Sequence, residues 1–261
     1  MKKSNRTLRT FVATTIKFII VMNLMITDNA FSQSFKTAQL EFERVRTAYK
    51  EKEATLKLRY KKVGFTSLAQ IIFIRAFKES SELELWALNT TTKKYILIHT
   101  YAICAKSGEL GPKRKEGDGQ VPEGFYSIAR FNPFSNYYLS LGVSYPNQSD
   151  RILGEKNRLG GDIFIHGDCV TIGCLPLTNT FIKELYVACV EAKNHGQKSI
   201  QVHIFPYRMS DKNHFEFAKS NAHKPKLIRF WDNIRIGYQY FENKKTLPIV
   251  SVDKQGKYLF K

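Results

Sequence analysis

The chain alternates between short apolar runs and turn-forming segments, which is the pattern of a β-rich protein. The runs are shorter than typical helices and are bounded by polar, Gly or Thr residues. They lie at 71–77, 83–88, 95–103, 125–128, 162–165 and 200–205. The first three follow one another closely, and this spacing predicts an antiparallel meander.

Apolar residues recur at helical intervals in other segments. Residues 35–63 lack Pro and Gly and predict an amphipathic helix or helix pair. A further helix is predicted between an N-cap at 178–179 and His195, where His-Gly ends the periodic pattern. Aromatic residues within 230–241 predict a C-terminal helix, whereas the Lys- and His-rich stretch 209–226 predicts a surface excursion.

The N-terminus has the three parts of a secretory signal. Basic residues in 1–9 precede the largely apolar stretch 11–26, and Ala-Phe-Ser at 30–32 provides a small-x-small cleavage site. We expect export to the periplasm with cleavage after Ser32. The alternative is an uncleaved membrane anchor, but Lys and Asn interrupt the apolar stretch before it reaches spanning length.

The charge of the protein favours anionic partners. The whole chain carries +18 at pH 7, and the leader holds five basic residues and one acid, so that +14 remains after cleavage. Nucleic acid is not expected, because no nucleic-acid-binding module is visible and the chain is predicted to be exported. A carboxylate-rich cell-wall polymer fits both the charge and the export, while a solvated basic surface without a role is the alternative.

The stretch 163–177, IFIHGDCVTIGCLPL, contains the strongest candidate chemistry. His166 is expected at the end of a strand and Cys174 on the loop that returns from it. An imidazole that takes the proton of a thiol makes that cysteine a nucleophile. The alternative is structural, because a free Cys is usually a small buried hydrophobe.

The other cysteines decide whether this thiol is free. Four cysteines, at 104, 169, 174 and 189, permit two disulfides in an oxidising compartment. A Cys169–Cys174 disulfide would leave no free thiol at Cys174 to act as a nucleophile. Cys189 lies on the apolar face of a predicted helix and is expected in the core. The Cys spacing matches no metal site, and we expect no metal or cofactor.

Several motifs resemble, in order, those of the L,D-transpeptidase catalytic domain of the YkuD type, in its YafK-like branch. They are SGELGPK at 107–113, GDG at 117–119, PEGFY at 122–126, YPN at 145–147, IHG at 165–167 and GC at 173–174. The resemblance extends from about residue 71 to about residue 241. It implies a mainly β fold with flanking helices, a sandwich or barrel-like catalytic domain.

The residue patterns and the resemblance together predict a division of the chain. The expected parts are a signal peptide (1–32), an N-terminal helical segment (33–68), the catalytic domain (69–207) and a C-terminal extension packed on that domain (208–261).

Matched to the family motif, Cys174 is the nucleophile and His166 the general base. Gly167 contributes the carbonyl that orients the imidazole, and Thr171 occupies the small hydroxyl position three residues before the cysteine. The N–H groups of Gly173 and Cys174 are expected in the oxyanion hole.

The residues that bind the substrate depart in one place from the family pattern. Pro176 stands where the wider family usually has Arg, and this departure leaves open which basic residue binds the donor carboxylate. Lys113, Arg151 and Arg158 are the candidates, and Tyr145 is a further substrate-binding candidate. The aromatic stretch 131–150 is expected either to line a groove or to pack as an ordinary loop.

The reaction implied by the resemblance is acyl transfer on peptidoglycan stem peptides. Cys174 attacks the L-centre carbonyl of diaminopimelate in a tetrapeptide stem, and the terminal D-Ala leaves. The acceptor is an amine, from a second stem or from a wall-linked protein. Water as acceptor would make the enzyme an L,D-carboxypeptidase or an amidase that releases wall-linked protein.

Two rivals from other classes remain at this point. An inactive wall-binding protein would have Cys169 bonded to Cys174, or His166 turned away from the thiol. A secreted cysteine protease rests on the Cys/His pair alone, because no papain-type signature surrounds the Cys.

Overall fold

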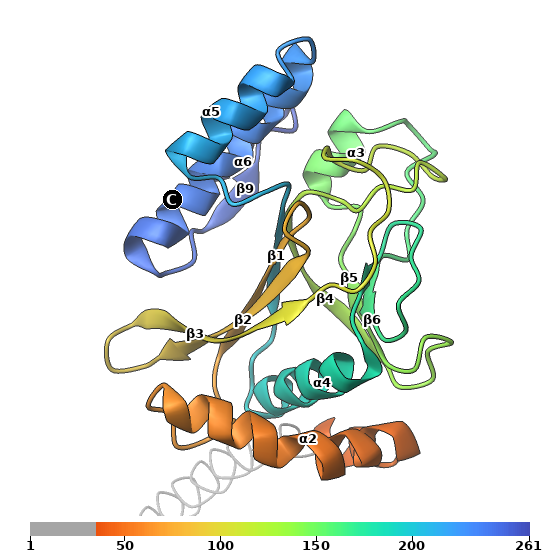
Figure 1. The fold of residues 1–261 in the computed structure, drawn as a ribbon, viewed down its shortest axis with the longest axis vertical. Helices are drawn as coiled ribbons and strands as arrows, with labels where there is room; N and C mark the ends of the chain where they lie inside the picture. Colours follow the sequence, from red (N-terminus) through yellow and green to blue (C-terminus); the bar gives the residue numbers. More distant parts are fainter. Residues whose placement is uncertain (1–34) are drawn as a thin grey trace, which may run out of the picture.

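The computed structural model describes residues 35–261, and the predicted signal peptide lies outside the described residues. One curled sheet dominates the fold (Figure 1). Its strands are β1 (Ile72–Phe77), β2 (Glu82–Asn89), β3 (Lys94–Ala102), β4 (Gly124–Asn132), β5 (Ser140–Val143), β6 (Phe164–His166), β7 (Leu175–Pro176) and β8 (Gln201–Phe205). They are hydrogen-bonded in the order β3-β2-β1-β8-β4-β5-β6-β7. This confirms the prediction of a mainly β, barrel-like domain with flanking helices.

The predicted meander is confirmed at one end of the sheet. β2 pairs antiparallel with both β1 and β3. β8 joins β1 in parallel and β4 in antiparallel orientation, so that a distant segment of the chain fills the middle of the sheet. The two edges of the sheet also approach each other, because Ile103, just after β3, forms an isolated bridge with Leu177, just after β7. This contact brings the end of β3 beside the segment that carries Cys174.

Helices surround the sheet. Residues 35–40 are helical, and the other helices are α2 (Glu43–Lys62), α3 (Gln148–Leu153), α4 (Asn179–Asn194), α5 (Asp211–Ser220) and α6 (Pro225–Lys244). The predicted surface excursion at 209–226 contains α5, whose N-cap is Ser210 and which has no buried residue. Its helical pattern has no buried apolar face, and for this reason the sequence did not reveal it. The small hairpin of β9 (Val250–Val252) and β10 (Tyr258–Phe260) packs beside α6.

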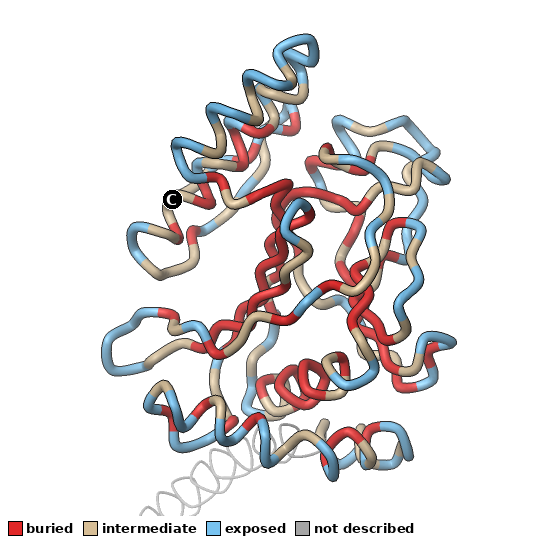
Figure 2. The backbone as a smooth tube through the Cα atoms, viewed as in Figure 1, coloured by how far each residue is buried: buried red, intermediate tan, exposed pale blue. Residues whose placement is uncertain are grey.

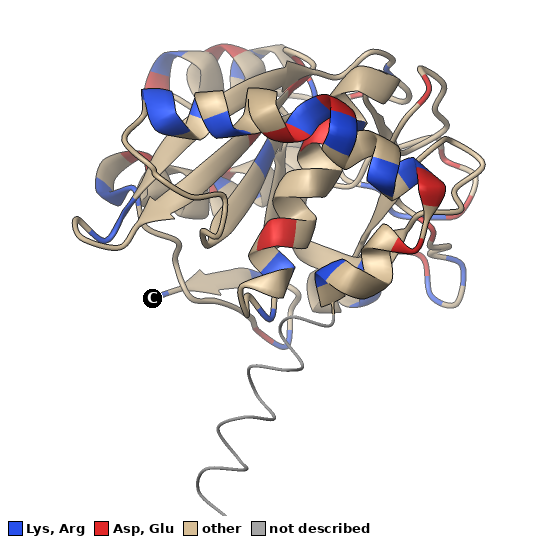
Figure 3. Ribbon diagram, turned by 90° about the horizontal axis from the view of Figure 1, so that it is seen from below, with Lys and Arg blue, Asp and Glu red and all other residues tan. Residues whose placement is uncertain are grey.

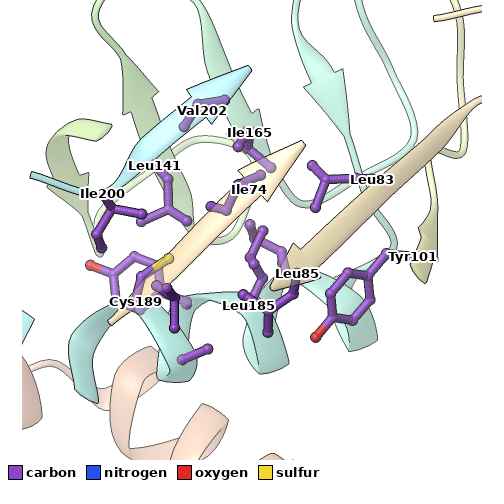
Figure 4. Packing of buried hydrophobic residues seen from close by; sticks show 14 of the residues in the cluster. Ile74, Leu83, Leu85, Tyr101, Leu141, Ile165, Leu185, Cys189, Ile200 and Val202 are labelled. Carbon is purple, nitrogen blue, oxygen red and sulfur yellow. The ribbon is translucent and has the colours of Figure 1, made fainter. Parts of the chain in front are cut away.

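The main core lies between the sheet and α4. Ile74 of β1, Leu85 of β2 and Ile165 of β6 are fully buried with Leu185 and Cys189 of α4 (Figure 4). The prediction that Cys189 belongs to the core is therefore confirmed. Burial is concentrated along the central strands and α4, and it decreases outward (Figure 2).

α2 covers the outer side of α4, and its own outer surface is charged (Figures 1 and 3). Val45, Ala48 and Leu56 of α2 are buried, whereas most of its Lys and Glu residues are solvent-exposed. The helix is thus amphipathic, as predicted. Within residues 35–261, no helix is both long enough and apolar enough to cross a membrane.

The C-terminal residues pack on the opposite side of the sheet. Trp231 and Tyr238 of α6 belong to one buried cluster with Phe77 of β1 and Phe205 of β8. Trp231 also donates a hydrogen bond from its indole N–H to Glu123, at 2.9 Å, beside β4. The helix is thus connected to the sheet by both apolar and polar contacts.

Candidate active site

Two very short strands hold the candidate nucleophile and base. β6 and β7 pair in parallel, with Ile165 opposite Leu175 and His166 opposite Pro176. Ile165 and Leu175 are buried in the main core. Because side chains alternate along a strand, His166 and Cys174 lie on the opposite face of this pair. Cys174 directly precedes β7 and His166 ends β6, as the sequence predicted.

The thiol of Cys174 is half-buried and free. The backbone N–H of Phe164 donates to its Sγ at 3.4 Å, and the thiol itself contacts the carbonyl oxygen of Asp162 at 3.6 Å. Burial raises the pKa of Cys174, and the Phe164 hydrogen bond and the charge of Lys113 oppose this effect. The resting group is therefore a neutral thiol, which needs a base to become a nucleophile.

The imidazole of His166 is held by its own neighbour. Its Nδ1 lies 2.5 Å from the carbonyl oxygen of Gly167. A carbonyl oxygen only accepts, so Nδ1 carries the hydrogen and Nε2 has a free lone pair. Burial lowers the pKa of His166, and the ring is therefore neutral at pH 7. Tyr137 covers the imidazole, with the two ring centroids 4.6 Å apart.

Gly167 is required by its surroundings. A Cβ atom there would lie 2.3 Å from Oδ1 of Asn179 and 2.8 Å from the carbonyl oxygen of Tyr137. Oδ1 of Asn179 accepts from the N–H of Asp168 at 2.9 Å, and the Asn179 amide donates back to the Asp168 carboxylate. The first residue of α4 thus fixes the loop that leaves His166.

Thr171 organises the turn before the cysteine. Its Oγ1 accepts hydrogen bonds from the N–H groups of Gly173 and Cys174, at 3.1 and 2.8 Å, and donates to the carbonyl oxygen of Cys174 at 2.9 Å. These are the two N–H groups predicted for the oxyanion hole. That role stays a prediction, and it requires Thr171 to share or release them when an oxyanion forms.

No hydrogen bond joins the imidazole directly to the thiol among residues 35–261. The two groups are diagonal neighbours on one face of the β6–β7 pair, since Phe164, beside Cys174, lies two residues before His166. Catalytic hydrogen bonds are often long in enzymes without substrate and shorten in the reacting complex. Direct proton transfer between the two groups therefore stays a prediction.

The predicted substrate-binding residues do not line the cavity beside Cys174, which has a volume of about 280 Å³. Lys113 is buried and binds Asp118 at 2.6 Å. Arg151 lies on α3, and Arg158 forms an exposed ion pair with Glu155. Tyr145 is buried and donates to the carbonyl oxygen of Leu159 at 3.2 Å. Their roles in substrate binding stay predictions.

The cavity is lined by residues 107–110 of the predicted SGELGPK motif and by residues that sequence reasoning missed. Lys106 and Ser81 line it together with Cys174. Nothing near Lys106 distinguishes it among 41 Lys and Arg residues. Tyr137, which covers His166, lies within the aromatic stretch 131–150, and this stretch was the available signal.

The observed disulfide leaves the thiol of Cys174 free. Cys104 is bonded to Cys169, and Cys174 and Cys189 are free. The Cys169–Cys174 disulfide predicted by the hypothesis of an inactive wall-binding protein is therefore wrong. Cys104 follows β3, and its N–H also binds the carbonyl oxygen of Pro176 at 3.0 Å. The disulfide thus ties the loop between His166 and Cys174 to the opposite edge of the curled sheet.

This pairing predicts a thiol count. Alkylation of the unfolded, non-reduced protein is expected to label Cys174 and Cys189 only, and prior reduction is expected to expose all four cysteines. Peptide mass mapping identifies the labelled residues. An unlabelled Cys174 would contradict the arrangement.

Two solved structures resemble parts of the chain. The helical cell shape determining protein Pgp2 from Campylobacter jejuni gives a TM-score of 0.42 at 18% identity, over 76% of this chain and 80% of that one. Bd1075 from Bdellovibrio bacteriovorus gives a TM-score of 0.38 at 24% identity, over 66% of this chain and 62% of that one.

Sequence comparison identifies the family. The chain is 40% identical over 190 residues to the Escherichia coli K12 protein named "Putative L,D-transpeptidase YafK", a match that covers 72% of this chain and 73% of that protein. The counterpart in Escherichia coli O157:H7 gives the same values. The family model of the L,D-transpeptidase catalytic domain, YkuD, matches residues 70–204, just over half of the chain. The protein therefore belongs to the L,D-transpeptidase (YkuD) family.

Proposed function

We propose that this protein is an exported cysteine acyl transferase that acts on peptidoglycan stem peptides. The observation that carries the proposal is a free, half-buried Cys174 beside a cavity, with His166 on the same strand face and oriented by Gly167. Family membership gives the substrate class, and the name of the relative YafK gives the same reaction. The predicted leader and the net charge of +14 after its removal agree with work in a carboxylate-rich wall.

The proposed reaction has two halves that share one intermediate. In the first, Nε2 of His166 takes the thiol proton of Cys174, and the sulfur attacks the L-centre carbonyl carbon of diaminopimelate. The carbon–nitrogen bond to D-Ala breaks, the departing nitrogen takes the proton from the imidazolium, and a thioester remains. In the second half an acceptor amine attacks the thioester carbonyl, a new amide bond forms, and the thiol is restored.

The acceptor decides between transfer and hydrolysis. An amine from another stem or from a wall-linked protein gives transpeptidation. Water gives an L,D-carboxypeptidase, or an amidase that releases a protein from the wall. The same thioester serves all three, so Cys174 and His166 have the same roles in each.

The test is incubation of the protein with tetrapeptide muropeptides, followed by mass spectrometry of both protein and products. A covalent adduct on Cys174 with loss of D-Ala is the expected result. Added amine acceptor that enters the product indicates transfer, and tripeptide product in its presence indicates hydrolysis. No adduct and no product from any tetrapeptide would contradict the proposal.

The pKa shifts predict how the rate depends on pH. His166 accepts a proton only when neutral, so kcat/KM falls as the pH falls through the pKa of His166. Burial places that pKa below the ordinary value of 6.5, and the acid limb is expected below pH 6.5. The measurement is the rate of D-Ala release between pH 4 and 9. An acid limb centred above pH 6.5 would contradict the neutral resting imidazole.

A further inference from the structure

The cavity beside Cys174 has an apolar interior and a charged rim. Ile103, Leu110, Val121 and Leu175 supply apolar lining next to the nucleophile. The volume of about 280 Å³ lies just below the range of roughly 300–1,000 Å³ that holds drug-sized ligands. The cavity is therefore large enough for a single amino-acid side chain.

The rim contains unpaired charges of both signs. Lys78 is already neutralised, since its Nζ binds Glu123 at 3.0 Å and the carbonyl oxygens of Gly111 and Val121. Lys106 is different, because it is exposed and, within residues 35–261, its Nζ has a single hydrogen bond, to the backbone carbonyl oxygen of Glu79 at 2.5 Å.

The acidic residues of the rim are also unpaired. The side chains of Glu79 and Glu109 are exposed and form no ion pair within residues 35–261. The cavity thus offers one available cation and two available carboxylates to a ligand.

An unsatisfied polar atom points to a ligand independently of these charges. Ser81 lines the cavity, and its hydroxyl oxygen is buried without a hydrogen-bond partner among the described residues. Its backbone is left-handed, with φ at 54°. Buried polar groups are rarely left unpaired in folded proteins, and strained residues concentrate at functional sites.

We propose that this cavity binds an aliphatic chain that ends in an amino-carboxylate. Lys106 binds the carboxylate, Glu109 binds the ammonium group, and the apolar interior packs against the methylenes. The inference rests on the proposed function, in which the ligand is the side chain of the diaminopimelate residue attacked by Cys174. That side chain consists of methylenes followed by a carbon that bears both an amine and a carboxylate.

Charge matching separates this ligand from the other groups near the thiol. The departing D-Ala offers a carboxylate but no ammonium group while it is still in its amide, so carboxylates on the rim would repel it. A lysine of a wall-linked protein, as acceptor, offers only a positive charge, which leaves Lys106 without a partner. The side chain of an acceptor diaminopimelate carries the same two groups as the donor, and the rate of thioester formation separates the two because this step precedes the acceptor. A group that carries both charges can pair with Lys106 and Glu109 together.

The proposal predicts substrate preference. A stem with Lys in the third position keeps the methylenes and the amine but lacks the carboxylate. A stem in which the side-chain carboxylate of diaminopimelate is amidated loses the same charge. The wild-type protein is expected to prefer the unmodified diaminopimelate stem by about tenfold in kcat/KM, because a hydrogen bond between charged groups is lost with the carboxylate.

The test compares four forms of the protein on three substrates. Rates of thioester formation on Cys174 are measured for the three tetrapeptides with the wild-type protein, Lys106→Gln, Lys106→Arg and Lys115→Gln. Lys106→Gln is expected to reduce the tenfold preference to about one, and Lys106→Arg to retain most of it. Lys115→Gln is the matched control, because Lys115 is exposed in the same loop region but does not line the cavity.

The outcomes separate this inference from the proposed function. Thioester that forms at equal rates on all three stems, or a Lys106→Gln variant that slows all three equally, would overturn the cavity assignment while the acyl transfer stands. An absence of thioester with every stem would overturn both. Far-ultraviolet circular dichroism and the melting temperature of each variant verify that the fold is intact.

Discussion

Cys174→Ala is expected to abolish the thioester and to lower the rate of D-Ala release by at least about 10³-fold. Among the described residues, the variant removes the only sulfur that lines the cavity. The measurement pairs intact-protein mass spectrometry with quantification of D-Ala from tetrapeptide muropeptides. Loss of both signals together would identify Cys174 as the point of attachment.

Cys189→Ala provides the matched control for this change. It makes the same substitution at the other free cysteine, which is fully buried on α4 away from the cavity. Its adduct and its D-Ala release are expected to match the parent, at the cost of some stability from lost packing. If Cys174→Ala formed as much product as Cys189→Ala, then Cys174 would have no part in the mechanism.

The sequence predicted the local arrangement of the site well, because its signals are short-range. A three-residue apolar run followed by His-Gly was enough to place His166 at a strand end. The resemblance also marked Thr171 as the small hydroxyl three residues before the cysteine. Its capture of the Gly173 and Cys174 N–H groups was not predicted, since this depends on the conformation of a turn and not on residue type.

The features that the sequence missed depend on long-range contacts. β7 has only two residues, one of them Pro, and no periodicity can reveal such a strand. The bridge from Ile103 to Leu177 closes the curl across 74 positions of the chain. The Cys104–Cys169 disulfide has a sequence separation of 65, and four cysteines alone permit three pairings. Lys106 joins the cavity only because this closure brings the end of β3 beside Cys174.

Glu123→Ala is expected to destabilise the protein by about 3–5 kcal/mol, because it leaves the buried Lys78 charge without its partner. Glu123 is fully buried, and its carboxylate also accepts from the N–H of Gly111 at 2.6 Å and from the indole of Trp231 at 2.9 Å. For a protein of this size the loss corresponds to a fall in melting temperature of roughly 10 °C. Calorimetry or chemical denaturation of the purified variant measures it.

Glu155→Ala is the matched control, because Glu155 pairs with Arg158 at the surface, where both side chains are largely exposed. Its effect is expected within about 0.5 kcal/mol, since exposed ion pairs contribute little to stability. The comparison separates a buried pair from a surface pair with the same chemical change. Equal losses from the two variants would show that the Lys78–Glu123 pair does not hold the fold.

The loss of Glu123 is also expected to change the shape of the cavity beside Cys174. Lys78 and Val121 line that cavity, and Glu123 holds Lys78 in place while it links the same region to Trp231 of α6. The combined variant Lys78→Met/Glu123→Met is expected to regain part of the lost stability, because the uncompensated charge is gone, but not the polar contacts to Gly111 and Val121. Stability that returns without D-Ala release would show that these polar contacts shape the substrate cavity. Return of both would assign Glu123 a purely structural role.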